Sequence, residues 1–128
     1  MGALHEALEA DAQLTHATEC YRRALKLDEN HIPALLGLAR TSEATGAIDD
    51  ALDYAQRAAD IAPEDADAIF TLAVCTARSG NVDEAAWLYE RAAGLSPAPG
   101  PILLTLGHLY SGTGQWPKAI DALRRSVE

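Results

Sequence analysis

Histidines and cysteines are the side chains of this chain best suited to metal binding or nucleophilic chemistry. The four histidines do not show the spacing of a metal site, and His5 beside Glu6 or Glu9 is better explained as a solvated pair on a helix. No glycine-rich phosphate loop, nucleophile elbow or Cys/His motif occurs. The sequence therefore predicts no catalytic residue, no metal and no cofactor. The other histidines are His16, His31 and His108.

The elements that position any site must follow a repeat, because the chain is periodic with a spacing of 34 residues. A fixed period of this length is typical of a helical solenoid, in which each unit buries its apolar face only against its neighbours. Small residues at one repeated position let two helices approach closely, and leucines fill the space beside them. The columns include Leu4, Leu38, Leu72 and Leu106; Ala17, Ala51, Ala85 and Ala119; Gly46, Gly80 and Gly114; and Pro63 and Pro97.

We predict a single all-α domain over residues 1–128, built from about four antiparallel helix pairs. The turn glycines end the first helix of each pair, since glycine enters the left-handed conformation without a Cβ penalty. Pro117 suits the first turn of the last helix, where a missing N–H costs nothing. We expect repeats at about 1–30, 31–64, 65–98 and 99–128, with helices at 2–10, 14–27, 31–44, 48–60, 65–78, 82–94, 100–111 and 116–127.

Composition limits the partners. The chain is 48% hydrophobic and carries a net charge of -9, so it has enough apolar residues to fold and repels nucleic acid and anionic lipid. The N-terminal residues contain no basic segment followed by an apolar stretch, and no segment is long and apolar enough to span a membrane. These features predict a cytoplasmic protein without nucleic-acid partners or membrane insertion.

The two cysteines, Cys20 and Cys75, lie in the first and third expected repeats. Neighbouring helices are about 10 Å apart, so these thiols should be too distant to form a disulfide. The small apolar neighbours of Cys75 favour a buried, structural role for that residue.

The order of Leu, Gly or Ala, Tyr, Gly, Ala, aromatic, Ala and Pro resembles the tetratricopeptide repeat family over essentially the whole chain. The resemblance implies a right-handed superhelix whose first helices line a concave groove that takes peptides or partner helices. It also implies a non-catalytic adaptor or scaffold. The residues that carry it best are Leu106, Gly107, Tyr110, Gly114 and Ala119 in the fourth copy, and Leu72, Ala73, Gly80, Ala85, Tyr89, Ala92 and Pro97 in the third.

The family's groove positions, transferred column by column, define the candidate binding residues. Phe70 and Val74 would supply apolar contact, and Arg40, Arg78 and Thr105 would orient the ligand, since arginine offers a planar fork of donors. Two alternatives remain open. The leucines of the set belong equally well to the core between repeats, and the arginines to ion pairs with acids such as Glu43 or Asp67. The full set is Leu36, Arg40, Phe70, Thr71, Val74, Arg78, Leu104, Thr105 and His108.

The chain departs from the family pattern at two places. The tryptophan near the start of each repeat is replaced by Leu35, Ile69 and Leu103. Some members hold a carboxylate in a clamp of Lys, Asn and Arg, and the matching positions here do not form that clamp, which disfavours the acidic tail of a chaperone as ligand. Those positions carry Leu36, Arg40, Thr71, Pro101 and Thr105.

Two other functions remain open beside peptide binding, namely a structural unit that stacks with copies of itself and the repeat region of a larger enzyme. The last helix places apolar residues at helical spacing with no obvious cover, which predicts end-to-end contact with a second copy or with further residues. These residues are Trp116, Ile120, Leu123 and Val127.

Overall fold

The computed structural model describes the backbone of residues 2–128 and the side chains of residues 14–128. Over this range the chain is all-α and contains no strand, which confirms the predicted solenoid class. The described helices are α1 (Gly2–Leu27), α2 (Ile32–Ala44), α3 (Ile48–Ile61), α4 (Ala66–Arg78), α5 (Val82–Leu95), α6 (Gly100–Gly112) and α7 (Trp116–Ser126).

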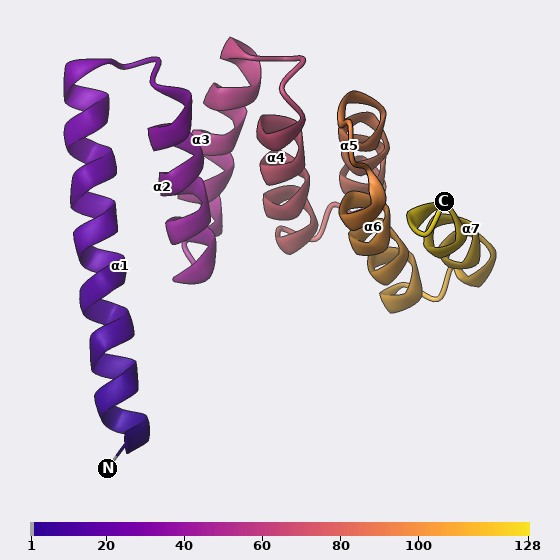
Figure 1. Cartoon of the computed structure of the whole chain (residues 1–128), viewed down its shortest axis with the longest axis horizontal. Helices are drawn as coiled ribbons and strands as arrows, with labels where there is room; N and C mark the ends of the chain where they lie inside the picture. The colour runs from indigo at the N-terminus through magenta and orange to yellow at the C-terminus, as the bar shows by residue number, and fades with distance from the viewer. Residues whose placement is uncertain (1) are drawn as a thin grey trace.

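The helices stand side by side in chain order, from the long α1 at one end to α7 at the other (Figure 1). The pairs α2–α3, α4–α5 and α6–α7 are helical hairpins, and each hairpin packs against the next. The first helices α2 and α4 also contact each other directly. Contacts therefore join neighbouring units of the array, as in other repeat proteins.

The turns inside the hairpins form where the glycine column predicts them. Gly46, Gly80 and Gly114 have φ values of 86°, 98° and 75°, in the left-handed region that residues with a Cβ avoid. Pro63 and Pro97 follow the ends of α3 and α5, where they prevent the helix from continuing.

Alanine columns form the centre of the core. Ala51, Ala85 and Ala119 are almost completely buried, and so are Ala58 and Ala92. With no side chain beyond Cβ, these residues let the helix backbones approach closely. The larger side chains Leu35, Leu38 and Leu106 then fill the remaining space, and all three are fully buried.

The first predicted hairpin is wrong. Where the columns predict helices at 2–10 and 14–27, the structure has the single continuous helix α1, whose N-terminal part extends well past the end of α2 (Figure 1). The consequence is visible in burial: Ala17 and Ala24 stay partly exposed, although the equivalent Ala51 and Ala58 are buried.

Two sequence features explain why α1 does not fold back. The turn column has Ala12 in place of glycine, and alanine favours the uninterrupted helix. The close-contact column that holds Gly107 in the last repeat has His5 in the first. A Cβ added at Gly107 would lie 2.7 Å from Leu123, so that position tolerates only a small residue beside a large one. In the first repeat, His5 would face Tyr21, and two large side chains would compete for that space.

Candidate functional site

A pocket of about 210 Å³ lies between the first helices α2 and α4. It brings together four of the candidate binding residues, which the sequence places on two successive repeats. Pockets for drug-sized ligands measure roughly 300–1,000 Å³, so this one has room for a single side chain rather than a small molecule. Its lining consists of Arg40 and Glu43 from α2, and Phe70, Thr71, Val74 and Cys75 from α4.

The apolar wall of the pocket is held in place by the core behind it. Phe70 is half-buried, and its ring lies 5.7 Å from the ring of Tyr89 on α5, at a tilt of 59°. This distance is within the range of favourable aromatic pairs. Val74 is also half-buried against the same core cluster. Both side chains therefore present one face to the pocket while the other face is fixed.

Two charged residues, Arg40 and Glu43, line the pocket, and Arg78, which is outside the lining, pairs with one of them. Nη1 of Arg78 is 3.0 Å from Oε1 of Glu43, an ion pair between α4 and α2. The Arg78 side chain is 57% exposed, so this pair contributes about 1 kcal/mol or less to stability. The guanidinium of Arg40 has no ion pair or hydrogen bond with the side chain of any residue in the described range 14–128. Arg40 is thus the cation of the pocket that has no partner among the side chains that the structure describes.

Cys75 is an uncharged member of the pocket lining. Burial, reinforced by the Glu43 carboxylate, raises the pKa of the Cys75 thiol from 9.0 to about 11, so the thiol is neutral at physiological pH. Burial likewise raises the pKa of Tyr89, behind Phe70, to about 12. Cys75 and Cys20 are both free, as predicted, and Cys75 is buried.

The other candidate residues lie outside the pocket. Leu36 is only 7% exposed and packs with Leu35, Ala58 and Ala68, in line with the core alternative for that position. On α6, Leu104 and His108 are exposed, and Thr105 donates its hydroxyl to the Pro101 carbonyl at 3.0 Å. These three residues lie in register with the pocket, one repeat further along the array.

Sequence reasoning missed two pocket residues. Glu43 entered only as an ion-pair partner, and Cys75 only as a core residue, yet both line the pocket. Glu43 follows Arg40 by three positions and Cys75 follows Val74 directly. The repeat columns gave one candidate position per turn of each helix. A pocket between two helices is also lined by residues at the positions next to those candidates.

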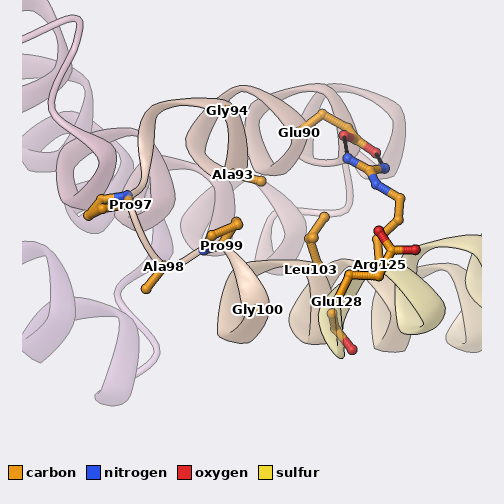
Figure 2. A pocket seen from close by; sticks show the side chains of 11 residues that line it. Glu90, Ala93, Gly94, Pro97, Ala98, Pro99, Gly100, Leu103, Arg125 and Glu128 are labelled. Atoms are coloured by element: carbon orange, nitrogen blue, oxygen red, sulfur yellow. Dashed lines mark hydrogen bonds and ion pairs between the residues drawn. The ribbon is translucent and has the colours of Figure 1, made fainter.

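A larger cavity, about 580 Å³, lies at the other edge of the array, where the α5–α6 connection meets the end of α7 (Figure 2). Its wall contains Pro97, Pro99 and Gly100, with Arg125 and Glu128 from the C-terminal end of the chain. Two of the charged residues in its wall, Glu90 and Arg125, pair with each other. It therefore offers fewer unused groups than the pocket between α2 and α4.

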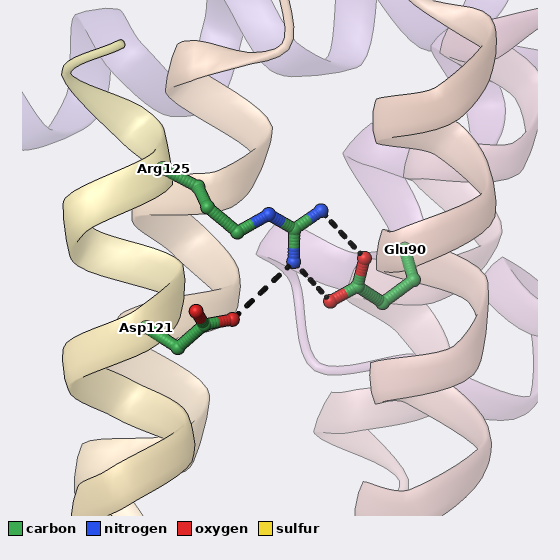
Figure 3. A network of polar contacts seen from close by, with 3 residues as sticks. All are labelled: Glu90, Asp121 and Arg125. Carbon is green, nitrogen blue, oxygen red and sulfur yellow. Dashed lines mark hydrogen bonds and ion pairs between the residues drawn. The ribbon is translucent and has the colours of Figure 1, made fainter.

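The charges of this second cavity form a network between repeats (Figure 3). Arg125 on α7 donates two hydrogen bonds to the carboxylate of Glu90 on α5, at 2.8 and 3.0 Å. Its Nη1 also lies 3.7 Å from Asp121. The bond to Glu90 raises the pKa of Arg125, which keeps the guanidinium charged. This bidentate pair joins α7 to the preceding repeat.

Within the described residues, no group of three or more His, Cys, Asp and Glu side chains gathers as a metal site would. None of the helices in the part of the chain that the structure describes is long and apolar enough to cross a membrane.

Comparison with known proteins agrees with the repeat architecture. A family model described as tetratricopeptide repeat matches residues 44–86, which include α3, α4 and the turn glycines on both sides. No curated protein sequence gives a match.

A crystal structure of MamA superposes with a TM-score of 0.79 at 24% sequence identity, covering 93% of this chain and 70% of the other. A second crystal structure of the MamA protein gives a TM-score of 0.77 at 23% identity, with coverages of 95% and 67%. A structure described as MamA MSR-1 C2 gives 0.73 at 22% identity, with coverages of 94% and 69%. At these identities the likeness establishes the fold.

The resemblance to the tetratricopeptide repeat family is thereby confirmed by the residues matched and by the architecture. The class of protein that they define is a helical repeat solenoid, in which stacked helix pairs present an extended surface.

Proposed function

We propose that this chain is a non-catalytic adaptor that binds an extended or helical peptide in the groove between its first helices. One observation supports this most directly: the pocket between α2 and α4 unites Arg40, Phe70, Thr71 and Val74 from two repeats. Their combination suits a peptide, because an apolar wall takes a side chain and an arginine without a partner in residues 14–128 takes a carboxylate or backbone carbonyl.

The test begins with a random peptide library displayed on phage and selected against the full chain. Binding of the selected peptides is then measured for the double variant Phe70→Ala/Arg40→Glu. We expect an affinity loss of about tenfold or more, the size typical of a central interface residue. Circular dichroism should show unchanged helicity.

A matched control changes the same residue types away from the groove. The variant Trp87→Ala/Arg57→Glu alters an exposed aromatic residue of α5 and an exposed arginine of α3. It should bind the selected peptides as the native chain does. If both variants lose the same affinity for the peptides, or if neither loses any, the binding surface does not lie in the groove.

A second candidate function, self-assembly through the C-terminal edge, is favoured by the outer face of α7. Ile120 and Trp116 are 56% and 60% exposed, and Val127 is 85% exposed. Ala119 and Ala122 on the opposite face are buried against the array. Apolar side chains gathered on one helix face are typical of a contact surface.

A further inference from the structure

His16 and Cys20 lie on successive turns of α1, and their side chains meet at the surface. The two residues are four positions apart, a spacing that places side chains on the same face of a helix. Both residues are exposed, and Nε2 of His16 lies 3.8 Å from Sγ of Cys20. The pair is separate from the pocket between α2 and α4. An imidazole nitrogen beside a thiol offers two good ligands to a divalent metal ion.

The distance between the two donor atoms fits a single zinc ion. Zinc binds thiolate sulfur at about 2.3 Å and imidazole nitrogen at about 2.0–2.1 Å, nearly always with tetrahedral geometry. Two such ligands of one ion are therefore about 3.5 Å apart, as these bond lengths and the tetrahedral angle require. The observed separation of 3.8 Å is close to this value. Because both side chains are exposed, small rotations can bring them to it without disturbing the core.

The chemistry of the pair selects the kind of ion. Thiolate and imidazole suit zinc and its neighbours among the transition metals, whereas magnesium and calcium take oxygen ligands. The surrounding charge does not oppose a cation, since Glu19 and Arg23, both exposed on the same helix, balance each other. The spacing of the four histidines gives no sign of this pair, because its second donor is a cysteine.

We propose that His16 and Cys20 form a two-ligand Zn²⁺ site on α1. His16 binds through Nε2 as the neutral ring, and Cys20 binds as the thiolate, with its proton passing to solvent. No group of three or more His, Cys, Asp and Glu side chains gathers within the described residues, so water takes the remaining two positions of the tetrahedron. The ion joins consecutive turns of α1, the helix that stands outside the three hairpins.

The test titrates Zn²⁺ into the reduced full chain and follows binding by isothermal calorimetry. We expect a dissociation constant of roughly 1–100 µM, much weaker than that of a four-ligand structural site. Mg²⁺ should not compete with Zn²⁺. Co²⁺, used as a spectroscopic substitute for Zn²⁺, should give the near-ultraviolet absorption of a thiolate bound to the metal. Bound zinc should also slow amide exchange across residues 16–20, because binding stabilises the turns that it joins.

Variants separate this pair from the other histidines and thiols of the chain. His16→Ala and Cys20→Ser should each weaken zinc binding by about tenfold or more, because a single remaining ligand does not form a chelate. Cys20→His should keep zinc binding, since it retains two donors at the same spacing, and should abolish the thiolate absorption with Co²⁺. The matched controls His108→Ala, at an exposed histidine of α6, and Cys75→Ala, at the buried thiol, should bind zinc as the native chain does.

Three results would overturn the inference: no zinc binding up to millimolar concentration, binding that is unchanged by His16→Ala or by Cys20→Ser, or an equal loss in His108→Ala or Cys75→Ala. The last result would place the metal at other side chains. All these variants lie outside the residues changed in the peptide test, Phe70→Ala/Arg40→Glu, so the zinc site and the peptide groove stand or fall separately.

Discussion

At the scale of single residues, the buried groups that can lose a proton make the fold sensitive to alkali. Burial raises the pKa of Cys75 to about 11 and that of Tyr89 to about 12, above the values these groups have when exposed. The folded state therefore holds these protons more tightly than the unfolded state does. The corresponding stability is fully present below pH 9 and decreases as the pH rises toward the raised pKa values.

We accordingly predict that the midpoint of urea unfolding falls between pH 9 and pH 11, and that Cys75→Ala makes this fall smaller. The alanine variant has no thiol to titrate, although it starts from a lower stability because it loses the sulfur's packing. Cys20→Ala is the control, because Cys20 is exposed and should leave the pH dependence unchanged. An identical slope in the native chain and Cys75→Ala would contradict the prediction.

The candidate site shows which binding residues can be predicted from a sequence and which cannot. Arg40 and Val74 share a column, and Phe70 and Thr71 lie on the same helix as Val74, so the family's groove positions, transferred to this chain, predict that they line one surface. Periodicity does not predict which members are covered by a neighbour: Leu36 shares a column with Phe70, yet it is buried in the core. The pairing of Arg78 with Glu43 depends on side-chain reach between two helices, which spacing along one helix does not determine.

At the scale of helices, the alanine columns determine how closely neighbours pack. Ala85 on α5 is completely buried. We predict that Ala85→Leu destabilises the chain by about 1–3 kcal/mol, because the added atoms have no space. The control is Ala17→Leu in the same column, which should be less costly, since Ala17 on α1 is partly exposed. Chemical denaturation measures both, and equal effects would show that the two sites are equally crowded.

The fold could be predicted from the sequence wherever the repeat is complete. All six helices from α2 to α7 lie within a few residues of their predicted ranges, because glycine turns and prolines define their ends. The fold of the first repeat could not be predicted in this way. Its leucine and alanine columns indicate a hairpin, whereas Ala12 and His5 disfavour a hairpin. The helical pattern is compatible with both outcomes, and the turn residue and the close contact decide between them.

This explanation of α1 can be tested by restoring the two missing features. We predict that His5→Ala/Ala12→Gly interrupts α1 near residue 12 and lets the first segment pack back on the second. Helical ¹³Cα shifts at residues 11–13 should be lost, and Ala17 and Ala24 should become protected from amide exchange.

The single variant Ala12→Gly is the control, because a glycine inside a helix costs about 1 kcal/mol without providing the close contact. It should weaken the helix locally and leave Ala17 and Ala24 no better protected. A straight, fully helical α1 in the double variant would show that other residues keep the hairpin open.

At the scale of the whole molecule, the two ends of the array differ. Along residues 14–27 of α1, most exposed side chains are polar, including Glu19, Arg22 and Arg23, and Leu27, at 90% exposed, is an exception. At the other end, α7 exposes Trp116 and Ile120. Head-to-tail stacking would bring a polar face against an apolar one, whereas a symmetric contact pairs apolar with apolar and closes after two copies.

We therefore predict a dimer formed through α7 rather than a filament. One helix face is small beside the roughly 1,600 Å² of a standard interface, so the dimer should be weak, with a dissociation constant in the micromolar range or above. Sedimentation equilibrium over a wide range of concentrations should show the mass rising toward two copies.

Ile120→Asp should stay folded and remain monomeric, because a carboxylate would be buried in the contact. Ile61→Asp is the matched control, since Ile61 is exposed on α3, away from α7, and should leave the association intact. A constant monomer mass for the native chain, or equal loss of association in both variants, would exclude the α7 face as the contact.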